Sequence, residues 1–182
     1  MKYTIAKGPY FDLRSATRLL EKYCINAPTT ARNAIRIAAS ICCPQNRSIL
    51  LESSPGVGKT SLIQNLAEIC GFRLVRLNLS EHIDLSDLLG SDLPAESQAS
   101  SNVTFEFIFG PVSRAVINDD WLLLDELNLA NQAVLEGLNS LLDHRKELYI
   151  PEVNRVLKCG KNFKLFAAQN PYSQGGGRKQ LP

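Results

Sequence analysis

One segment constrains what this chain can fold into more than any other: Ser53–Thr60, which reads SSPGVGKT. It follows a short apolar run, Ser48–Leu51, and leads into the helical pattern of Lys59–Ile69. Glycines between a buried strand and the start of a helix are typical of a loop that binds phosphate. Backbone N–H groups of such a loop converge at the positive end of the helix dipole, so the segment predicts a nucleotide site. The alternative is a glycine-rich turn with a chance lysine.

The residues of this loop have distinct expected roles. The predicted nucleotide contacts are Ser54, Pro55, Gly56, Val57, Gly58, Lys59, Thr60 and Ser61. Lys59 would neutralise the β- and γ-phosphates of ATP, and the Thr60 hydroxyl would bind Mg²⁺. Ser53 departs from the usual pattern, which has glycine at that place. A positive φ at this serine would cost about 1–2 kcal/mol, whereas an extended backbone would cost little.

A second motif is Trp121–Glu126, WLLLDE, an apolar strand that ends in two acids. Asp125 could hold Mg²⁺ through water, and Glu126 could orient and activate an attacking water molecule. The alternative is a strand that simply ends in solvated acids. Two acids in succession favour hydrolysis over phosphoryl transfer to a small molecule.

A third motif is Phe166–Pro171, FAAQNP, in which another apolar strand ends in polar residues. Asn170 could reach the γ-phosphate and the attacking water. The alternative is an asparagine that caps a turn before proline, which is common.

Apolar strands and helices alternate along the rest of the chain, which is typical of an α/β fold with a parallel sheet and helices on both faces. Core strands are predicted at residues 48–52, 73–79, 121–125 and 163–169. Residues 103–108 alternate like one strand of a β-hairpin, and residues 148–157 like a whole hairpin. We take residues 1–44 as an N-terminal helical linker region and residues 45–182 as the core. The second linker helix would bury Ala31, Ala34, Ile35, Ala38 and Ile41.

Composition excludes several classes of protein. The chain has 182 residues and a net charge of +2, so it is long enough to bury a core without disulfides and shows no basic surface for nucleic acid. No apolar run approaches the roughly 20 residues that a membrane helix needs. The five cysteines form no Cys-x-x-Cys motif, which predicts buried free thiols in a reducing compartment.

Together the three motifs resemble those of AAA+ ATPases, and the chain is most similar to the midasin family, dynein-related AAA+ ATPases of ribosome assembly. The specific segments are Asp125–Ala130 (DELNLA) and Leu142–Arg145 (LDHR), within a likeness that runs from about residue 27 to residue 182. Bacterial MoxR-type AAA+ chaperones are an alternative, but they usually have arginine where this chain has Leu129.

The resemblance implies a P-loop NTPase fold, the large subdomain of an AAA+ module that binds ATP with Mg²⁺. It implies that Thr60 and Asp125 hold the metal, and that Lys59, Glu126 and Asn170 act in hydrolysis, Asn170 as sensor 1. The implied partners are neighbouring AAA+ modules of a pseudo-hexameric ring, and pre-60S ribosomal particles with their assembly factors, in the nucleus. We expect no membrane contact and no direct sequence-specific binding of nucleic acid.

The chain ends where an AAA+ module would add an arginine-finger helix, a fifth core strand and a helical lid. We therefore expect residues 45–182 to be a partial AAA+ core, from the phosphate loop to just past sensor 1, in a fragment or truncated paralogue. The usual strand order, 5-1-4-3-2, then leaves one edge of the strand at residues 48–51 open. An arginine finger supplied in trans is worth ~10³–10⁵ in comparable NTPases, so the isolated chain should hydrolyse ATP barely at all. The alternative is a nucleotide-binding or structural module that never hydrolyses.

Overall fold

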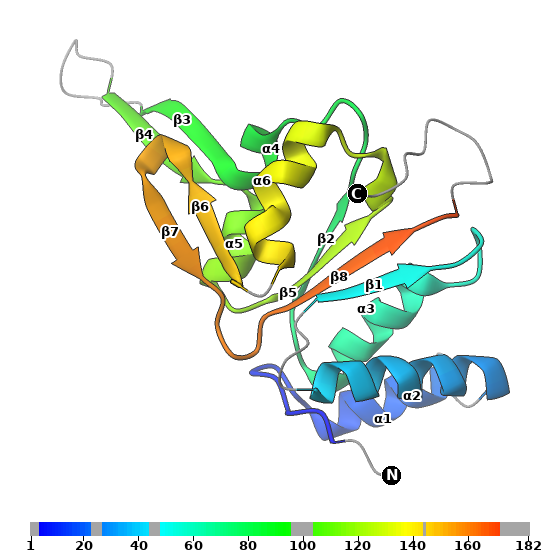
Figure 1. The fold of residues 1–182 in the computed structure, drawn as a ribbon. Helices are drawn as coiled ribbons and strands as arrows, with labels where there is room; N and C mark the ends of the chain where they lie inside the picture. The colour runs from blue at the N-terminus through cyan, green and yellow to red at the C-terminus, as the bar shows by residue number, and fades with distance from the viewer. Residues whose placement is uncertain (1–3, 23–26, 44–47, 96–103, 144, 172–182) are drawn as a thin grey trace.

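The computed structural model describes residues 4–22, 27–43, 48–95, 104–143 and 145–171. A parallel sheet of four strands, in the order β1-β8-β5-β2, lies at its centre (Figure 1). These strands are Ser48–Glu52 (β1), Leu74–Asn78 (β2), Trp121–Asp125 (β5) and Lys164–Gln169 (β8). The predicted strands and their order are confirmed, with β2 and β8 slightly shorter than expected.

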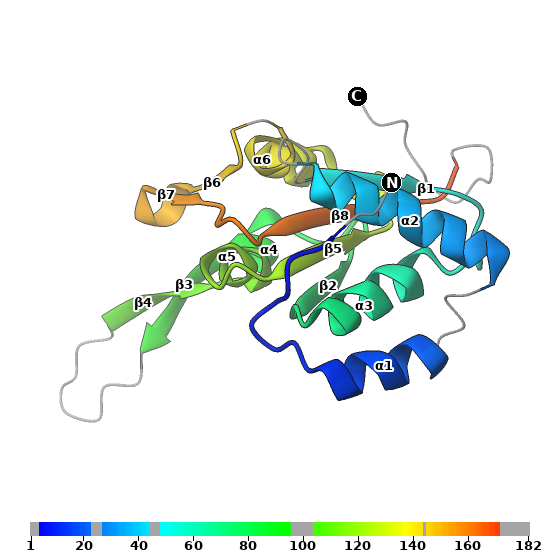
Figure 2. The ribbon, with the colours of Figure 1, turned by 90° about the horizontal axis from the view of Figure 1, so that it is seen from below.

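Helices cover both faces of this sheet, as the strand pattern predicted (Figures 1 and 2). On one side lie α2 and α3, with α1 packed against α3; their bounds are Leu13–Lys22 (α1), Pro28–Cys42 (α2) and Lys59–Cys70 (α3). On the other side lie Leu85–Leu89 (α4), Pro111–Ile117 (α5) and Gln132–Leu142 (α6). Two short 3₁₀ turns complete the helical elements, Leu127–Leu129 (η1) and Pro151–Val153 (η2). None of the described helices is long and apolar enough to cross a membrane.

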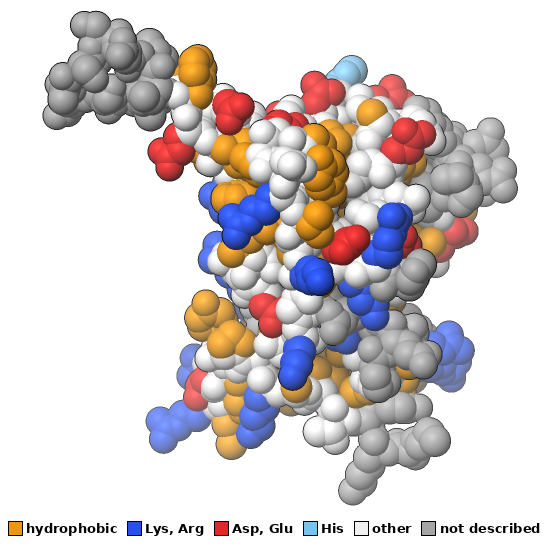
Figure 3. Space-filling view, turned by 60° about the vertical axis from the view of Figure 1, so that its left-hand side comes forward, with side chains coloured by type: hydrophobic (Ala, Val, Ile, Leu, Met, Phe, Trp, Pro, Cys, Tyr) orange, Lys and Arg blue, Asp and Glu red, His pale blue; other side chains and the backbone are white. Residues whose placement is uncertain are grey.

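Two antiparallel hairpins project from one side of the molecule (Figure 1). Gly90–Ala95 (β3) pairs with Thr104–Phe109 (β4), and Glu147–Ile150 (β6) pairs with Arg155–Lys158 (β7). The second hairpin was predicted, whereas only one strand of the first was. Apolar, basic and acidic side chains are interspersed on this side of the molecule (Figure 3). The exposed large apolar residues of the hairpins are Leu93, Phe105, Ile108, Tyr149, Val153 and Val156.

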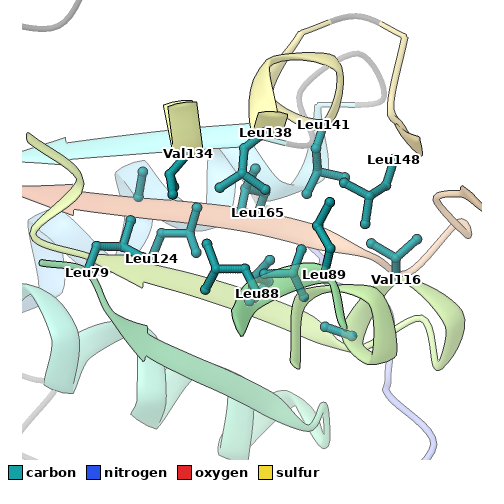
Figure 4. Close-up of a cluster of buried hydrophobic side chains, with 14 of the residues drawn as sticks. Leu79, Leu88, Leu89, Val116, Leu124, Val134, Leu138, Leu141, Leu148 and Leu165 are labelled. Atoms are coloured by element: carbon teal, nitrogen blue, oxygen red, sulfur yellow. The ribbon is translucent and has the colours of Figure 1, made fainter. Parts of the chain in front are cut away.

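The sheet separates two clusters of buried apolar side chains. The larger cluster fills the space between the sheet and helices α4, α5 and α6, with Leu124 and Leu165 among its members (Figure 4). The smaller cluster lies on the α3 side, where the ring of Trp121 stacks on Phe72 at 4.9 Å and meets Phe166 at 5.1 Å. With both faces buried, β5 is enclosed along its whole length, which fixes the position of its carboxyl end.

The buried face of α2 differs from the predicted one. Ala34 and Ile41 are buried as expected, whereas Ala31 and Ala38 are half-buried and Ile35 is 58% exposed. The third buried residue is Ile37. The helix packs on the sheet and on α3 along a narrow stripe at positions 34, 37 and 41, spaced by three and four residues. Ile35 lies outside this stripe because it is one residue away from Ala34, about 100° around the helix.

Cys42, Cys43, Cys70 and Cys159 form no disulfide, as predicted, and each is half-buried rather than buried. Cys24 lies outside the described residues. Burial, reinforced by the nearby Cys42 thiol, raises the pKa of Cys70 to about 11. At neutral pH this side chain is therefore a protonated thiol that packs beside the smaller cluster.

Candidate nucleotide site

A cavity of about 320 Å³ opens at the carboxyl ends of β1, β8 and β5. Parallel strands bring their carboxyl ends to one edge of the sheet, and β8 lies between β1 and β5, so the three sequence motifs meet there. The lining residues are Pro55, Gly56, Val57, Gly58, Lys59, Thr60, Ser61, Asp125, Glu126 and Asn170. Every predicted site residue except Ser54 lines the cavity, and the carbonyl of Ser54 accepts a hydrogen bond from Lys59.

Two glycines give the phosphate loop its shape. Gly56 has φ +78° and Gly58 has φ +84°, and Gly58 is the residue from which α3 begins. A side chain at either position would be strained by about 1–2 kcal/mol, because L-residues avoid the left-handed region. Ser53 is not among the described non-glycine residues that have a positive φ. Serine therefore replaces the usual glycine at this place without backbone strain.

Lys59 folds back over the loop and reaches across the sheet. Its Nζ donates to the carbonyl of Ser53 at 2.6 Å, to that of Ser54 at 3.2 Å and to Asn170 Oδ1 at 2.8 Å. Asn170 is only 5% exposed, and its Nδ2 donates to Glu126 Oε1 at 2.6 Å. One amide thus joins the lysine of the first motif to the glutamate of the second.

The position of Asn170 is itself fixed by a residue that the sequence did not single out. Asn128, in η1, is 2% exposed, and its Nδ2 donates to the backbone carbonyl of Asn170 at 2.9 Å. This bond ties the end of β8 to the turn that follows β5. The candidate catalytic groups therefore rest on hydrogen-bonded backbone rather than on an isolated loop.

The predicted metal ligands lie next to each other. Thr60 Oγ1 donates to Asp125 Oδ2 at 2.9 Å, and Arg76 Nη2 on β2 donates to the same oxygen at 2.8 Å. A hydroxyl and a carboxylate are hard oxygen ligands of the kind that Mg²⁺ prefers, and the arginine shows that this carboxylate accepts a cationic partner. The donor set fits the metal. Among the described residues no group of three or more His, Cys, Asp or Glu could enclose an ion, so phosphate oxygens and water would complete the coordination.

A second cavity, of about 410 Å³, adjoins the loop on the side of α2. It lies between α2, β1 and the phosphate loop, and it combines apolar and polar groups. Its lining residues are Asn33, Arg36, Ile37, Leu50, Leu51, Glu52, Ser53, Val57, Gly58, Lys59 and Leu62. Val57, Gly58 and Lys59 line both cavities, so a ligand with a phosphate chain could occupy the two together.

The family model of the AAA domain, dynein-related subfamily, matches residues 48–182. The chain belongs to this subfamily of AAA domains. The match begins at β1 and includes the three motifs that form the site.

Two midasins are similar to this AAA domain over nearly its whole length. Identity is 52% over 179 residues with midasin of Giardia intestinalis and 51% over 173 residues with midasin of Dictyostelium discoideum. These alignments cover 98% and 95% of this chain but only 4% and 3% of the two midasins. The resemblance to midasin that the motifs indicated is confirmed, and the chain corresponds to a small part of such a protein.

More distant relatives share the domain. An uncharacterized protein of Staphylococcus aureus is 33% identical over 125 residues, which is 69% of this chain and 47% of that protein. Among solved structures, a candidate ATPase from Cytophaga hutchinsonii superposes with a TM-score of 0.59 at 25% identity, covering 93% of this chain and 46% of the other. These findings support the α/β P-loop NTPase fold.

Proposed function

We propose that this chain is an ATP-binding module of a midasin-type AAA+ ring, in which ATP hydrolysis drives the removal of assembly factors from pre-60S ribosomal particles. One observation carries the nucleotide part of the proposal. The carboxylate of Glu126, the amide of Asn170 and the ammonium of Lys59 form a continuous hydrogen-bonded series along one wall of the cavity. Such an arrangement supplies a cation that can bind phosphate, a carboxylate that can activate water, and a polar amide that lies between these two groups.

The chemistry assigned to each side chain follows from its present partners. Lys59 exchanges the carbonyls of Ser53 and Ser54 for phosphate oxygens, which neutralises charge that builds up during phosphoryl transfer. Lys59 also gives up its contact with Asn170 Oδ1 in favour of phosphate, and this oxygen can then accept a hydrogen bond from a water molecule beside Glu126. Glu126 accepts a proton from this water as a general base. Thr60, and Asp125 through water, would hold Mg²⁺, which would supply charge neutralisation at the phosphates.

The second cavity supports a nucleoside triphosphate rather than inorganic phosphate as ligand. It offers apolar side chains, Ile37, Leu51 and Leu62 among them, directly beside the loop that would hold the phosphates. A flat heterocyclic base is mostly apolar on its faces and gains by leaving water. The pair of cavities thus accommodates both ends of ATP.

Calorimetric titration of the 182-residue chain with MgATP tests the proposal. We expect measurable binding by the native chain and its loss in Lys59→Ala, because that variant removes the cation nearest the phosphates. Lys161→Ala is the matched control, since Lys161 is an exposed lysine outside both cavities at the site, and it should bind like the native chain. A folded native chain that does not bind MgATP, or equal binding by all three proteins, would refute a nucleotide site here.

The ring, the ribosomal substrate and the nuclear location rest on the resemblance to midasin. Sequence identity of about one half over nearly the whole chain supports them. Sucrose-gradient sedimentation of nuclear extract that contains the tagged chain tests this part, with co-sedimentation at the pre-60S position as the expected result. Sedimentation at the top of the gradient, with intact MgATP binding, would leave a nucleotide-binding module with a different partner.

A further inference from the structure

Arg76 is a charged residue inside the core sheet for which the three motifs provide no role. It lies on β2, and its guanidinium forms an ion pair with Asp125, the predicted metal ligand, at 2.8 Å. The neighbouring strand β5 brings the two residues together, because Asn78 is the register partner of Asp125 and Arg76 is two residues earlier on the same strand face. Arg76 therefore occupies one oxygen of the carboxylate that would serve Mg²⁺.

The two members of this ion pair are unequally accessible to solvent. The side chain of Asp125 is 12% exposed, and that of Arg76 is 52% exposed. Thr60 also holds Asp125 through the same oxygen, so the carboxylate keeps its position without the arginine. The guanidinium, by contrast, can leave for water at little cost, because exposed ion pairs contribute little free energy.

A groove of about 400 Å³ between α3 and β2 gives Arg76 another place to lie. Gln64 and Glu68 of α3 line it together with Arg73 and Arg76. Glu68 is exposed and offers a second carboxylate on the same groove. The arginine thus has one acidic neighbour inside the nucleotide site and another outside it.

We propose that Arg76 is a resident counter-ion of Asp125 that competes with Mg²⁺, so that it sets the Mg²⁺ concentration at which the chain binds nucleotide. This inference rests on the proposed nucleotide site. A positive charge within a few ångströms repels a divalent cation and also neutralises the carboxylate that would attract it. Removal of the guanidinium leaves Asp125 in place, held by Thr60, with its full charge available to the metal.

The test is calorimetric titration of the 182-residue chain with ATP over a series of Mg²⁺ concentrations and in EDTA. In Arg76→Gln we expect the Mg²⁺ concentration for half-maximal enhancement of binding to fall by up to about fivefold, the upper end for an exposed ion pair. Arg76→Lys keeps a cation at this place and should stay near the native midpoint. Arg73→Gln is the matched control, because Arg73 lines the same groove but its acidic neighbour is Asp120, at 3.9 Å, and it should leave the midpoint unchanged.

An unchanged midpoint in Arg76→Gln would overturn the proposal, and a raised midpoint would make Arg76 a residue that positions Asp125 for the metal. Failure of the proposed function gives a different result, in which the native chain binds no ATP with or without Mg²⁺. In that case Mn²⁺ binding to the nucleotide-free chain, followed by water-proton relaxation, still tests the competition. Tighter Mn²⁺ binding by Arg76→Gln than by Arg73→Gln would support it, and equal binding would refute it.

Discussion

Glu126 directly follows β5 and adopts φ 56° and ψ 45°, a left-handed conformation that residues other than glycine rarely use. The turn brings its carboxylate to the amide of Asn170 inside the cavity. Backbone strain of this kind persists where the surrounding structure imposes it, and such residues cluster at functional sites. The left-handed backbone at Glu126 therefore lowers the stability of the fold, but it places the Glu126 carboxylate beside Asn170 in the cavity.

Two substitutions that both remove the carboxylate of Glu126 allow the backbone strain to be measured by itself. We expect Glu126→Gly to be more stable than Glu126→Ala by about 1 kcal/mol, because only alanine keeps the left-handed penalty. At an ordinary position the order is the reverse, since glycine gains more entropy on unfolding. Urea denaturation at equilibrium measures the difference. Equal stability, or a more stable alanine variant, would mean that the backbone is not strained at this residue.

At the residue scale, the sequence predicted the groups that belong to short motifs. Lys59, Thr60, Asp125, Glu126 and Asn170 each follow directly from a strand, a glycine loop or a pair of acids. Their roles as nucleotide, metal and catalytic residues remain predictions, and the titration of Lys59→Ala with MgATP tests that of Lys59.

The sequence did not predict the contacts made by Arg76 and Asn128. Both depend on which strands are neighbours, because Arg76 reaches Asp125 from β2 and Asn128 reaches the carbonyl of Asn170 at the end of β8. A charged residue between the apolar residues Val75 and Leu77 was the only sign of the first contact.

At the scale of elements, Asp119 joins the turn before β5 to the loop before β8. Its carboxylate accepts hydrogen bonds from the backbone N–H of Asn162 at 3.1 Å and of Phe163 at 2.7 Å, and from Asn162 Nδ2 at 2.9 Å. Gly160 lies so close that a Cβ there would be 2.2 Å from Asp119 Oδ1. The carboxylate thus aligns the amino ends of the two strands whose carboxyl ends carry Asp125 and Asn170.

Replacement of Asp119 by alanine should destabilise the fold by about 2–4 kcal/mol, because hydrogen bonds to a charged acceptor are lost and a backbone donor before β8 loses its partner. Asp119→Asn keeps one acceptor oxygen and a residue that tolerates the positive φ of 59°, so it should lose less. Thermal unfolding of both variants measures the two losses. An alanine variant as stable as the native chain would show that the strands align without this carboxylate.

The elements that the sequence predicted well are those with strong local signals. Strands β1 and β5 are apolar runs, and helix α3 directly follows the glycine loop that predicted its start. Strand β3 was missed because Gly90–Ala95 contains glycine, proline and aspartate, which disfavour strands. Its extended form depends on pairing with β4, a contact that no local pattern reveals.

At the scale of the whole molecule, the open edge of β1 is the main structural liability. Among the described residues β1 pairs with β8 alone, and the chain before it forms helices rather than a covering strand. The open edge that the strand order predicted is thus confirmed for this part of the chain. Leu50, in the middle of β1, is 51% exposed, so this strand presents an apolar side chain as well as the backbone N–H and C=O groups of its open edge.

An exposed apolar edge strand pairs readily with a second copy. We therefore expect the isolated 182-residue chain to self-associate at a concentration on the order of 100 μM, which sedimentation velocity over a dilution series would detect. Leu50→Lys should keep the chain monomeric over this range, because a lysine on an edge strand repels another copy and costs desolvation in the pair. Ile117→Lys is the matched control: Ile117 is 50% exposed on α5, away from this edge, and its replacement should leave association unchanged. If both lysine variants reduce association equally, exposed apolar surface in general drives self-association, and the β1 edge has no special part in it. If the native chain stays monomeric at every concentration, the β1 edge does not pair with a second copy, and the prediction is wrong.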